Sequence, residues 1–332
     1  MTISSNISLL PFNTFHLDAH ARMLIEYDSV EELRAVLREH HGERMLHIGQ
    51  GSNLLFVRDF DGIVLRSRMA RARALGENGD EVFIEAQNGL ILDSLIAQLC
   101  DMGLIGLENL SYIPGTVGAS AVQNVGAYGV EAKDVIVEVH TVSVTDGEER
   151  IFSNEECRFG YRDSIFKNEL KNKYIVTSVV YRLLKRGDFH LDYGNLRQAL
   201  QGAPSAMRVR EAVIAIRQQK LPEVAKLGSA GSFFKNPVVS PAQFAVLAQQ
   251  YPDIPHFDAE GGVKVPAAWL IDRLGWKGKT KGGAQVYPKQ PLVIVNMGAA
   301  SAADIVDLAQ QIMDSVIERF GIHLHPEVNY IE

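Results

Sequence analysis

Apolar residues recur at helical spacing in two short segments of the N-terminal half. Ser29 followed by Glu32 has the form of a capping box, and the apolar positions after it lie on one helical face as far as Gly42: Val30, Leu33, Val36 and Leu37. The segment LILDSLIAQLCDM, residues 90–102, has the same spacing and is followed by Gly103. The pattern therefore predicts two amphipathic helices in this half.

Alternating or continuous apolar runs predict strands in the rest of that half. In MLHIGQGSNLLFV, residues 45–57, apolar segments stand on both sides of two glycines, which predicts two strands joined by a glycine loop. IVEVHTVSVTDGEERIF alternates around Asp146-Gly147, a hairpin signal, and YIVTSVVYRL adds a further strand. The N-terminal half is thus expected to contain few helices and many strands.

The pattern changes to mainly helical from about Asn195. Helical spacing appears in NLRQALQ, MRVREAVIAIRQQ, SPAQFAVLAQQY and PAAWLIDRL, with Ser240 as a predicted N-cap, and a last helix is expected from Ser301 to Gly321 before a final strand in HPEVNYIE. This change favours an α+β protein with a domain boundary near residues 186–205.

Composition and charge limit the class of protein. The chain has 332 residues, 46% hydrophobic and 22% charged, as expected of a globular protein with two or three domains, and its net charge of −7 argues against a nucleic-acid partner. Cys100 and Cys157 have no second cysteine at metal-ligand or redox spacing, so we expect no metal site, two buried thiols and a reducing compartment. With no signal-peptide pattern and no apolar run long enough to span a bilayer, a cytoplasmic protein without membrane contact is expected.

Two glycine-rich segments are the candidates for ligand binding. In Gly49-Gln50-Gly51-Ser52-Asn53, glycines allow successive N–H groups to converge on an anion such as a pyrophosphate, although such a segment is by itself more often only a turn. Leu54 stands where a Rossmann fingerprint requires glycine or alanine, and no helix begins there, so a Rossmann fold is disfavoured. The second segment, IPGTVGASAVQNVGAYG, lets backbone approach a flat or charged ligand closely.

Six ordered blocks resemble the UDP-N-acetylenolpyruvoylglucosamine reductase family almost from end to end. They are NTFH from Asn13, GQGSNLLF, IPGTVGASAVQNVGAYGVE, FGYRDSIFK from Phe159, GSAGSFFKNP from Gly228, and HPEVNYI. The loop around Tyr193-Gly194-Asn195 resembles the longer, type I form of the family, in which a tyrosine covers the nucleotide sugar. Together the blocks are specific, although several of them would mean little alone.

The resemblance implies a fold and a reaction. The implied fold is α+β, with a two-lobed FAD-binding domain of the vanillyl-alcohol-oxidase type over residues 12–187. A smaller α+β substrate-binding domain would follow over 188–322, and the last strand, 323–332, would return to the first lobe. The implied reaction is NADPH-dependent reduction of UDP-N-acetylglucosamine enolpyruvate to UDP-N-acetylmuramate in peptidoglycan synthesis, with noncovalent FAD. A monomer is expected.

The resemblance also implies three catalytic residues. Arg162 would bind the substrate carboxylate and the developing enolate through its planar, permanently charged fork. Ser232 would donate the proton to the carbanionic carbon. Glu327 would act with the arginine, either as a protonated hydrogen-bond donor with a raised pKa or by positioning Arg162. Without the family, Arg162 would be a solvated partner of Asp163, and Ser232 a turn residue.

The remaining site residues are transferred from the same motifs. Those expected to bind FAD lie in the two glycine segments: Gly49, Gly51, Ser52, Asn53, Ile113, Pro114, Gly115, Thr116, Gly118 and Gly126. Those expected to bind the substrate are Tyr161, Tyr193, Lys220, Asn236, Lys277 and Gln290. Phe257 stands where the family often has tyrosine, which weakens the expected nucleotide contacts there.

Two alternative functions stay open. An FAD-dependent sugar or lactone oxidase of the same fold would be favoured by covalent flavin, for which His16 and His20 are available. A nonenzymatic nucleotide-sugar sensor would have no need of Arg162, Ser232 and Glu327 together.

Overall fold

The computed structural model describes all residues, 1–332, and the chain forms two compact units. Unit 1 contains residues 1–7, 21–50 and 61–219, and unit 2 contains residues 8–20, 51–60 and 220–332. This division differs from the domains expected from the sequence. Unit 1 extends to Gln219 instead of ending at residue 187, and residues 8–20 and 51–60 belong to unit 2 together with the C-terminal part of the chain. The physical reason is that the helix over residues 206–220, which contains Gln219, packs against other residues of unit 1.

The first sheet of unit 1 has four strands in the order β1-β2-β5-β3. Their bounds are Thr2–Ser8, His20–Tyr27, Phe60–Ser67 and Met45–Ile48, and β3 runs parallel to β5. Helix α1, Val30–Glu39, begins at Ser29, whose side chain accepts a hydrogen bond from the Glu32 N–H. The expected helix is confirmed, but its capping box is not reciprocal, because Glu32 accepts from the Asp28 N–H instead.

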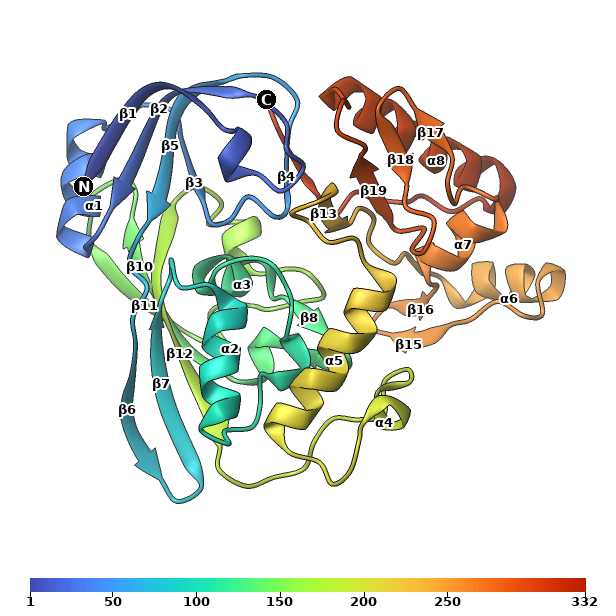
Figure 1. Ribbon diagram of the computed structural model, residues 1–332, viewed down its shortest axis with the longest axis horizontal. Helices are drawn as coiled ribbons and strands as arrows, with labels where there is room; N and C mark the ends of the chain where they lie inside the picture. Colours follow the sequence, from blue (N-terminus) through green and yellow to red (C-terminus); the bar gives the residue numbers. More distant parts are fainter. The chain divides into compact units, whose positions relative to one another are not determined.

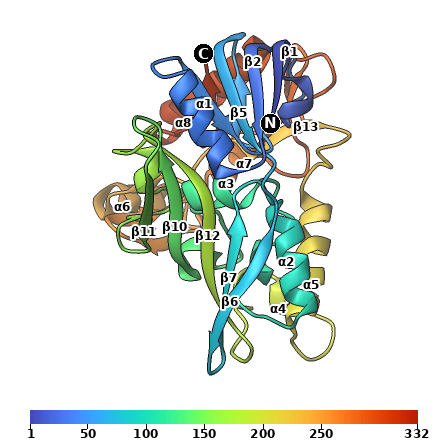
Figure 2. The ribbon, with the colours of Figure 1, turned by 90° about the vertical axis from the view of Figure 1, so that its left-hand side faces the viewer.

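The second sheet of unit 1 is antiparallel, with five strands in the order β11-β10-β12-β7-β6 (Figures 1 and 2). Their bounds are Glu149–Ser153, Ile136–Ser143, Tyr174–Leu184, Glu81–Gln87 and Ala72–Asn78. The loop between β10 and β11 holds Asp146 and Gly147, as the hairpin signal predicted. The short strands β8, Gly126–Ala127, and β9, Val130–Glu131, pair separately.

Helices α2, Leu92–Asp101, and α3, Val117–Gln123, share a hydrophobic core with this sheet. The four-residue helix α4, Leu196–Ala199, and the longer α5, Ala206–Lys220, complete the unit. Figure 1 shows α5 running beside α2, and Arg210 of α5 forms an ion pair with Asp93 of α2. These contacts explain why α5 clusters with the N-terminal residues and not with those that follow it.

Unit 2 has three small sheets and three helices. The sheet orders are β13-β19-β18-β17, β14-β16-β15 and β20-β4. The strand bounds, from β13 to β20, are Gly228–Ser232, Val238–Val239, Phe257–Ala259, Gly262–Lys264, Thr280–Lys281, Ala284–Val286, Val293–Asn296 and Asn329–Ile331, and β4 is Leu54–Phe56. The helices are α6, Pro241–Gln250, α7, Ala267–Arg273, and α8, Ala302–Phe320, which ends at left-handed Gly321.

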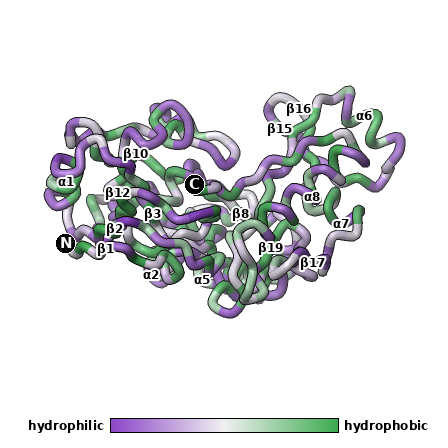
Figure 3. The backbone as a smooth tube through the Cα atoms, turned by 90° about the horizontal axis from the view of Figure 1, so that it is seen from above, coloured by the Kyte–Doolittle hydropathy of each residue, from purple (hydrophilic) through white to green (hydrophobic).

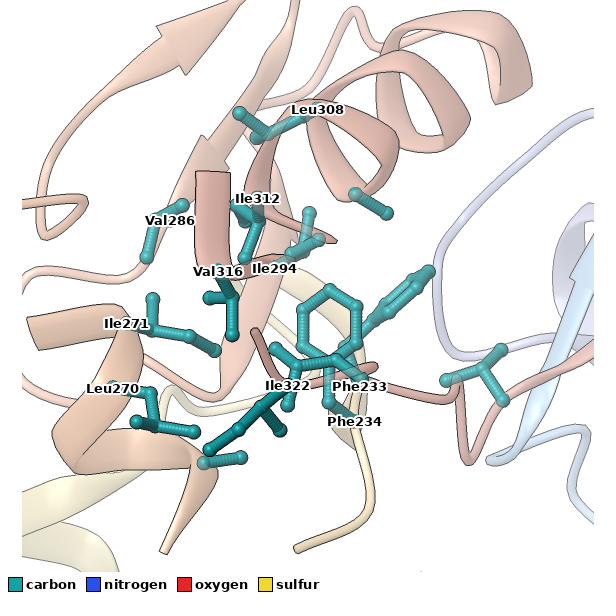
Figure 4. Close-up of a cluster of buried hydrophobic side chains, with 14 of the residues drawn as sticks. Phe233, Phe234, Leu270, Ile271, Val286, Ile294, Leu308, Ile312, Val316 and Ile322 are labelled. Atoms are coloured by element: carbon teal, nitrogen blue, oxygen red, sulfur yellow. The ribbon is translucent and has the colours of Figure 1, made fainter. Parts of the chain in front are cut away.

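One apolar cluster holds unit 2 together, and Figure 4 shows the side chains at its centre. Ile312 and Val316 of α8 lie beside Ile294 of β19, while Phe233 and Phe234 come from the segment directly after β13. The alternation of apolar and polar positions along α8 can be followed in Figure 3. Because Phe233 and Phe234 are buried, the segment directly after β13 is anchored in the core of unit 2.

The expected α+β, two-part fold is confirmed, and the main error lies in the second glycine segment. Residues 117–123, expected only to approach a ligand as backbone, form helix α3 with Thr116 as N-cap. No apolar pattern indicated β1, β2, β5 or the β6–β7 hairpin, and the helices after Asn195 are interspersed with the short strands β13 to β19, which were not expected. No helix in the structure is both long enough and apolar enough to cross a membrane.

Candidate active site

The two glycine segments meet within unit 1. A Cβ atom on Gly49 would lie 2.7 Å from Thr116 Oγ1, and the Gly115 N–H donates to Gln50 Oε1 at 2.6 Å. Gly118 packs against Asn88, where a Cβ atom would lie 2.8 Å from the Asn88 Cβ. These approaches leave no room for side chains at Gly49 and Gly118, so the two segments pack closely, through bare backbone, against neighbouring residues of unit 1.

The first glycine segment also belongs to unit 2 through its second half. Gly51 has a φ of +64°, and a Cβ atom on it would lie 2.1 Å from the Phe12 carbonyl oxygen. Asn53 Nδ2 donates to the Glu327 carbonyl at 3.2 Å, and the Asn53 carbonyl accepts from the Asn329 N–H. Asn53, expected to donate to a phosphate, thus joins β4 to the C-terminal strand.

Arg162 lies in a tight turn whose backbone is unusual. Gly160 and Asp163 pair reciprocally, with N–H to carbonyl distances of 3.0 and 3.1 Å, and Arg162 has a φ of +54°. Its Nη2 donates to the Gly126 carbonyl at 2.6 Å, and a Cβ atom on Gly126 would lie 2.8 Å from Nη1. Left-handed backbone in a residue other than glycine costs about 1–3 kcal/mol and often marks functional sites.

Asp163 is engaged by its own loop. Its Oδ1 accepts from the Ser164 N–H and, like Oδ2, from the Asn168 side chain at 3.0 Å. The guanidinium of Arg162 instead reaches the glycine segment, and its centre lies 5.2 Å from the Tyr161 ring. This arrangement does not favour the simple view of Arg162 as a solvated partner of Asp163.

Ser232 and Glu327 are neighbours in unit 2. The ladder between β13 and β19 is irregular between Ser229 and Ser232, where Gly231 has a φ of +70°, and Ser232 is exposed. Such irregularities redirect side chains out of a regular strand. The Glu327 N–H donates to the Phe233 carbonyl at 2.8 Å, which brings Glu327 next to the residue that follows Ser232.

Tyr193 lies among other aromatic and basic groups of unit 1. It is 53% exposed, and its ring stands edge-on to Tyr128 with centroids 6.2 Å apart. Arg217 of α5 donates from Nε to the Tyr112 carbonyl, and burial lowers its pKa below the ordinary arginine value. Burial also raises the pKa of Tyr128. A buried guanidinium beside these tyrosines makes this part of the unit suited to anionic groups.

The other expected substrate contacts serve local structure in unit 2. Asn236 Oδ1 accepts from the Ala267 N–H at the start of α7, and Lys277 Nζ lies 2.8 Å from Asp272 Oδ2 near its end. Gln290 Oε1 accepts from the Leu292 N–H at 3.4 Å. Lys220 is the exposed last residue of α5.

Sequence reasoning missed two polar side chains that shape these segments. Gln50 stands between two glycines of the first segment, and its side chain joins the two glycine segments. Asn124, in the second glycine segment, is fully buried, and its side chain donates to the Gly160 carbonyl. Asparagine in a glycine-rich segment is a signal for left-handed backbone, which is the conformation that Asn124 adopts.

Comparisons with known proteins now bear on the family. Residues 21–153 match an FAD binding domain, and residues 222–331 match the C-terminal domain of UDP-N-acetylenolpyruvoylglucosamine reductase. Proteins named UDP-N-acetylenolpyruvoylglucosamine reductase from Bacteroides fragilis and Pseudomonas aeruginosa are 45% and 44% identical, over 98% and 99% of both chains. This chain belongs to the UDP-N-acetylenolpyruvoylglucosamine reductase family.

A solved structure supports the fold independently. The crystal structure of UDP-N-acetylenolpyruvylglucosamine reductase from Thermus caldophilus is 24% identical and superimposes with a TM-score of 0.72, covering 100% of both chains. Family membership thus confirms the resemblance that the six sequence blocks carried, and the match over residues 21–153 gives the N-terminal part as an FAD-binding domain.

Proposed function

We propose that this protein reduces the enolpyruvyl ether of UDP-N-acetylglucosamine to the lactyl ether of UDP-N-acetylmuramate, a step of peptidoglycan synthesis, with NADPH as reductant. The observation that carries the proposal is the 41–45% identity, over nearly the whole chain, to proteins named for this reductase activity. Because the identity covers both units, the relatives share the FAD-binding part and the C-terminal part alike.

The glycine segments are suited to hold FAD. Gly49, Gly118 and Gly126 each sit where a Cβ atom would lie 2.7–2.8 Å from another group of unit 1, so the chain packs closely around these glycines. N–H groups of such segments bind a pyrophosphate, and Thr116 begins helix α3 among them. Ile113, Pro114, Gly115 and Ser52 lie in the same two segments. Bound FAD would supply a hydride from its N5 atom after taking one from NADPH.

The chain's own residues would handle charge and the proton. Hydride addition to the terminal carbon of the enol ether leaves negative charge shared between the next carbon and the carboxylate. Arg162, held at one side by the Gly126 carbonyl, would bind that carboxylate with its remaining N–H groups. Ser232 would give its hydroxyl proton to the carbon bearing the carboxylate, and regain one from solvent. The overall reaction consumes one NADPH and one proton.

Glu327 is proposed to act with Arg162. Its backbone is fixed at two points, by the N–H that donates to Phe233 and the carbonyl that accepts from Asn53. A residue whose backbone is held at two points suits a positioning role. Glu327→Gln separates the alternatives in part: near-normal turnover would exclude an obligatory charge, whereas severe loss would leave positioning and proton transfer open.

The nucleotide part of the substrate is proposed to contact Tyr193, Lys220, Asn236, Lys277 and Gln290, with Tyr161 beside Arg162. Tyr193 is the best supported of these, since its ring is exposed and stands edge-on to Tyr128. Phe257 is 50% exposed and lacks the hydroxyl expected there, so we propose no polar contact from it.

The decisive experiment is an anaerobic visible spectrum of the purified protein. Bleaching of the flavin bands by one equivalent of NADPH, followed by recovery on adding UDP-N-acetylglucosamine enolpyruvate, would establish both half-reactions. If the flavin bands recovered only with oxygen, the protein would be the sugar or lactone oxidase. If NADPH did not bleach them, it would be the nucleotide-sugar sensor. Arg162→Ala and Ser232→Ala should bleach but recover slowly, whereas Asn154→Ala, a variant outside the proposed site, should behave as the wild type.

A further inference from the structure

Helix α3 ends at Asn124, and both polar atoms of the Asn124 side chain form hydrogen bonds. It is fully buried, with left-handed backbone at φ +45° and ψ +60°. Its Nδ2 donates to the Gly160 carbonyl at 2.8 Å and to Glu131 Oε2 at 3.1 Å, and its Oδ1 accepts from the Lys133 N–H at 3.0 Å. A buried amide with these bonds is a fixed point of the structure.

The Gly160 carbonyl belongs to the turn that carries Arg162. The other side of that turn is held by Lys167, whose Nζ donates to the Arg162 carbonyl at 2.9 Å and to Gln123 Oε1 at 2.7 Å. Gln123 is the last residue of α3, and Asn124 follows it. The end of this helix therefore holds the Arg162 turn on both sides, at the Gly160 carbonyl directly and at the Arg162 carbonyl through Lys167. Two residues further on, the Gly126 carbonyl accepts from the guanidinium itself.

We propose that Asn124 is a positioning residue: it fixes the turn of Arg162, so that the guanidinium meets the substrate carboxylate in one orientation. This inference rests on the proposed role of Arg162. A turn with left-handed backbone at Arg162 costs energy and persists only where surrounding contacts impose it. The bond from Asn124 to Gly160 is a contact of that kind, made from a rigid helix end.

The position requires an asparagine for three reasons together. The residue must tolerate left-handed backbone, donate to a carbonyl and accept from an N–H. Glycine meets only the first requirement. Aspartate meets the first and the third, but its second oxygen would face the Gly160 carbonyl and the Glu131 carboxylate without a proton to share. Asn124→Gly and Asn124→Asp therefore remove the positioning bond in different ways while keeping the backbone conformation.

Asn154 offers a matched control in the same unit. Its Nδ2 also donates to two carbonyls, those of Lys133 and Ile136, both at 2.8 Å, but it does not bind the turn of Arg162. Asn154→Ala should therefore lower the thermal midpoint about as much as Asn124→Gly does. Its ratio of substrate-driven flavin reoxidation to NADPH-driven flavin reduction should stay at the wild-type value.

The test compares these variants in stopped-flow half-reactions, with calorimetric binding of UDP-N-acetylmuramate as a readout that needs no turnover. In Asn124→Gly the ratio of reoxidation to reduction rates should fall by about 10- to 100-fold, the effect of misplacing a reacting group by about 1 Å. Product binding should weaken by about 5- to 10-fold, the effect of one weakened charge-assisted bond. In Asn124→Asp the ratio of reoxidation to reduction rates should fall by at least as much. This variant replaces Asn124→Gly in the test if the glycine variant does not fold.

A double-mutant cycle separates positioning from general destabilisation. If Asn124 acts through Arg162, adding Asn124→Gly to Arg162→Ala should slow reoxidation by less than about 3-fold, because the group that it positions is gone. A full further loss in that background would overturn the proposal, as would equal rate ratios in Asn124→Gly and Asn154→Ala. If Arg162→Ala alone reoxidises at the wild-type rate, the proposed role of Arg162 fails first.

Discussion

Replacing Gly51 by alanine tests whether the first glycine segment depends on close backbone contact. Two effects add at this position. The residue has a φ of +64°, which costs an alanine about 1 kcal/mol, and the new Cβ would lie 2.1 Å from the Phe12 carbonyl oxygen. Because that neighbour is backbone, relief requires the chain itself to move, at a cost of about 1–3 kcal/mol. Gly51→Ala should therefore destabilise unit 2 by about 2–4 kcal/mol.

Gly321 provides a control with the same backbone conformation. It also has a φ of +64° and belongs to unit 2, but a Cβ there would meet nothing within 4 Å. Gly321→Ala should cost only the backbone strain, about 1 kcal/mol. The difference between the two variants isolates the contact with Phe12.

Tryptophan fluorescence is a suitable assay, because both tryptophans, Trp269 and Trp276, lie in unit 2. Urea unfolding should show a lower midpoint for Gly51→Ala than for Gly321→Ala, and only Gly51→Ala should lose flavin during purification. Equal midpoints and equal flavin content in the two variants would refute the argument, since the contact with Phe12 would then carry no cost.

Three further predictions concern other residues of the site and the core. Arg162→Lys keeps the charge but loses the planar fork that reaches the Gly126 carbonyl, so kcat/KM should fall by about 10²- to 10³-fold, and a loss below 3-fold in steady-state assays would contradict the role. Asn109 Nδ2 donates to the Tyr128 and His190 carbonyls at 2.9 and 2.8 Å, and Asn109→Ala leaves both carbonyls unpaired. This variant should raise KM for the nucleotide sugar more than it lowers kcat. An unchanged KM would argue against a link to Tyr193. Burial lowers the pKa of His47 to about 4. Between pH 6.5 and 4 the unfolded chain therefore binds a proton that the folded chain does not, so the free energy of unfolding should fall by about 1–3 kcal/mol as the pH is lowered through this range. Urea titrations of wild type and His47→Gln across that range should show a shallower pH dependence in the variant.

The sequence predicted those elements whose signals are local. Ser29, Ser240 and Ser301 cap their helices as expected, because a side-chain oxygen three residues before an N–H acts without help from the rest of the fold. Gly103 and Gly321 both adopt left-handed backbone after their helices. The strands on both sides of the first glycine segment also form where the apolar runs lie.

The sequence did not predict features that depend on distant partners. Helix α3 contains a glycine, a serine and two valines, whose helix propensities are below that of alanine, and it is stabilised by packing of Val117 and Ala121 in the core of unit 1. The bond from Arg162 to the Gly126 carbonyl joins residues 36 positions apart, and no pattern in either segment indicates it. The catalytic roles of Arg162, Ser232 and Glu327 likewise rest on the family resemblance and not on any local pattern.

The first glycine segment illustrates the limit most clearly. From the sequence it is one loop between two strands, and both strands exist. The structure assigns its halves to different units: Gly49 and Gln50 contact Thr116 and Gly115 in unit 1, whereas Gly51 packs on Phe12 in unit 2. The strands that it joins are in different sheets, since β3 pairs with β5 and β4 with β20. Two glycines separated by one residue thus serve two separate packing requirements, and substitution of each should destabilise a different unit.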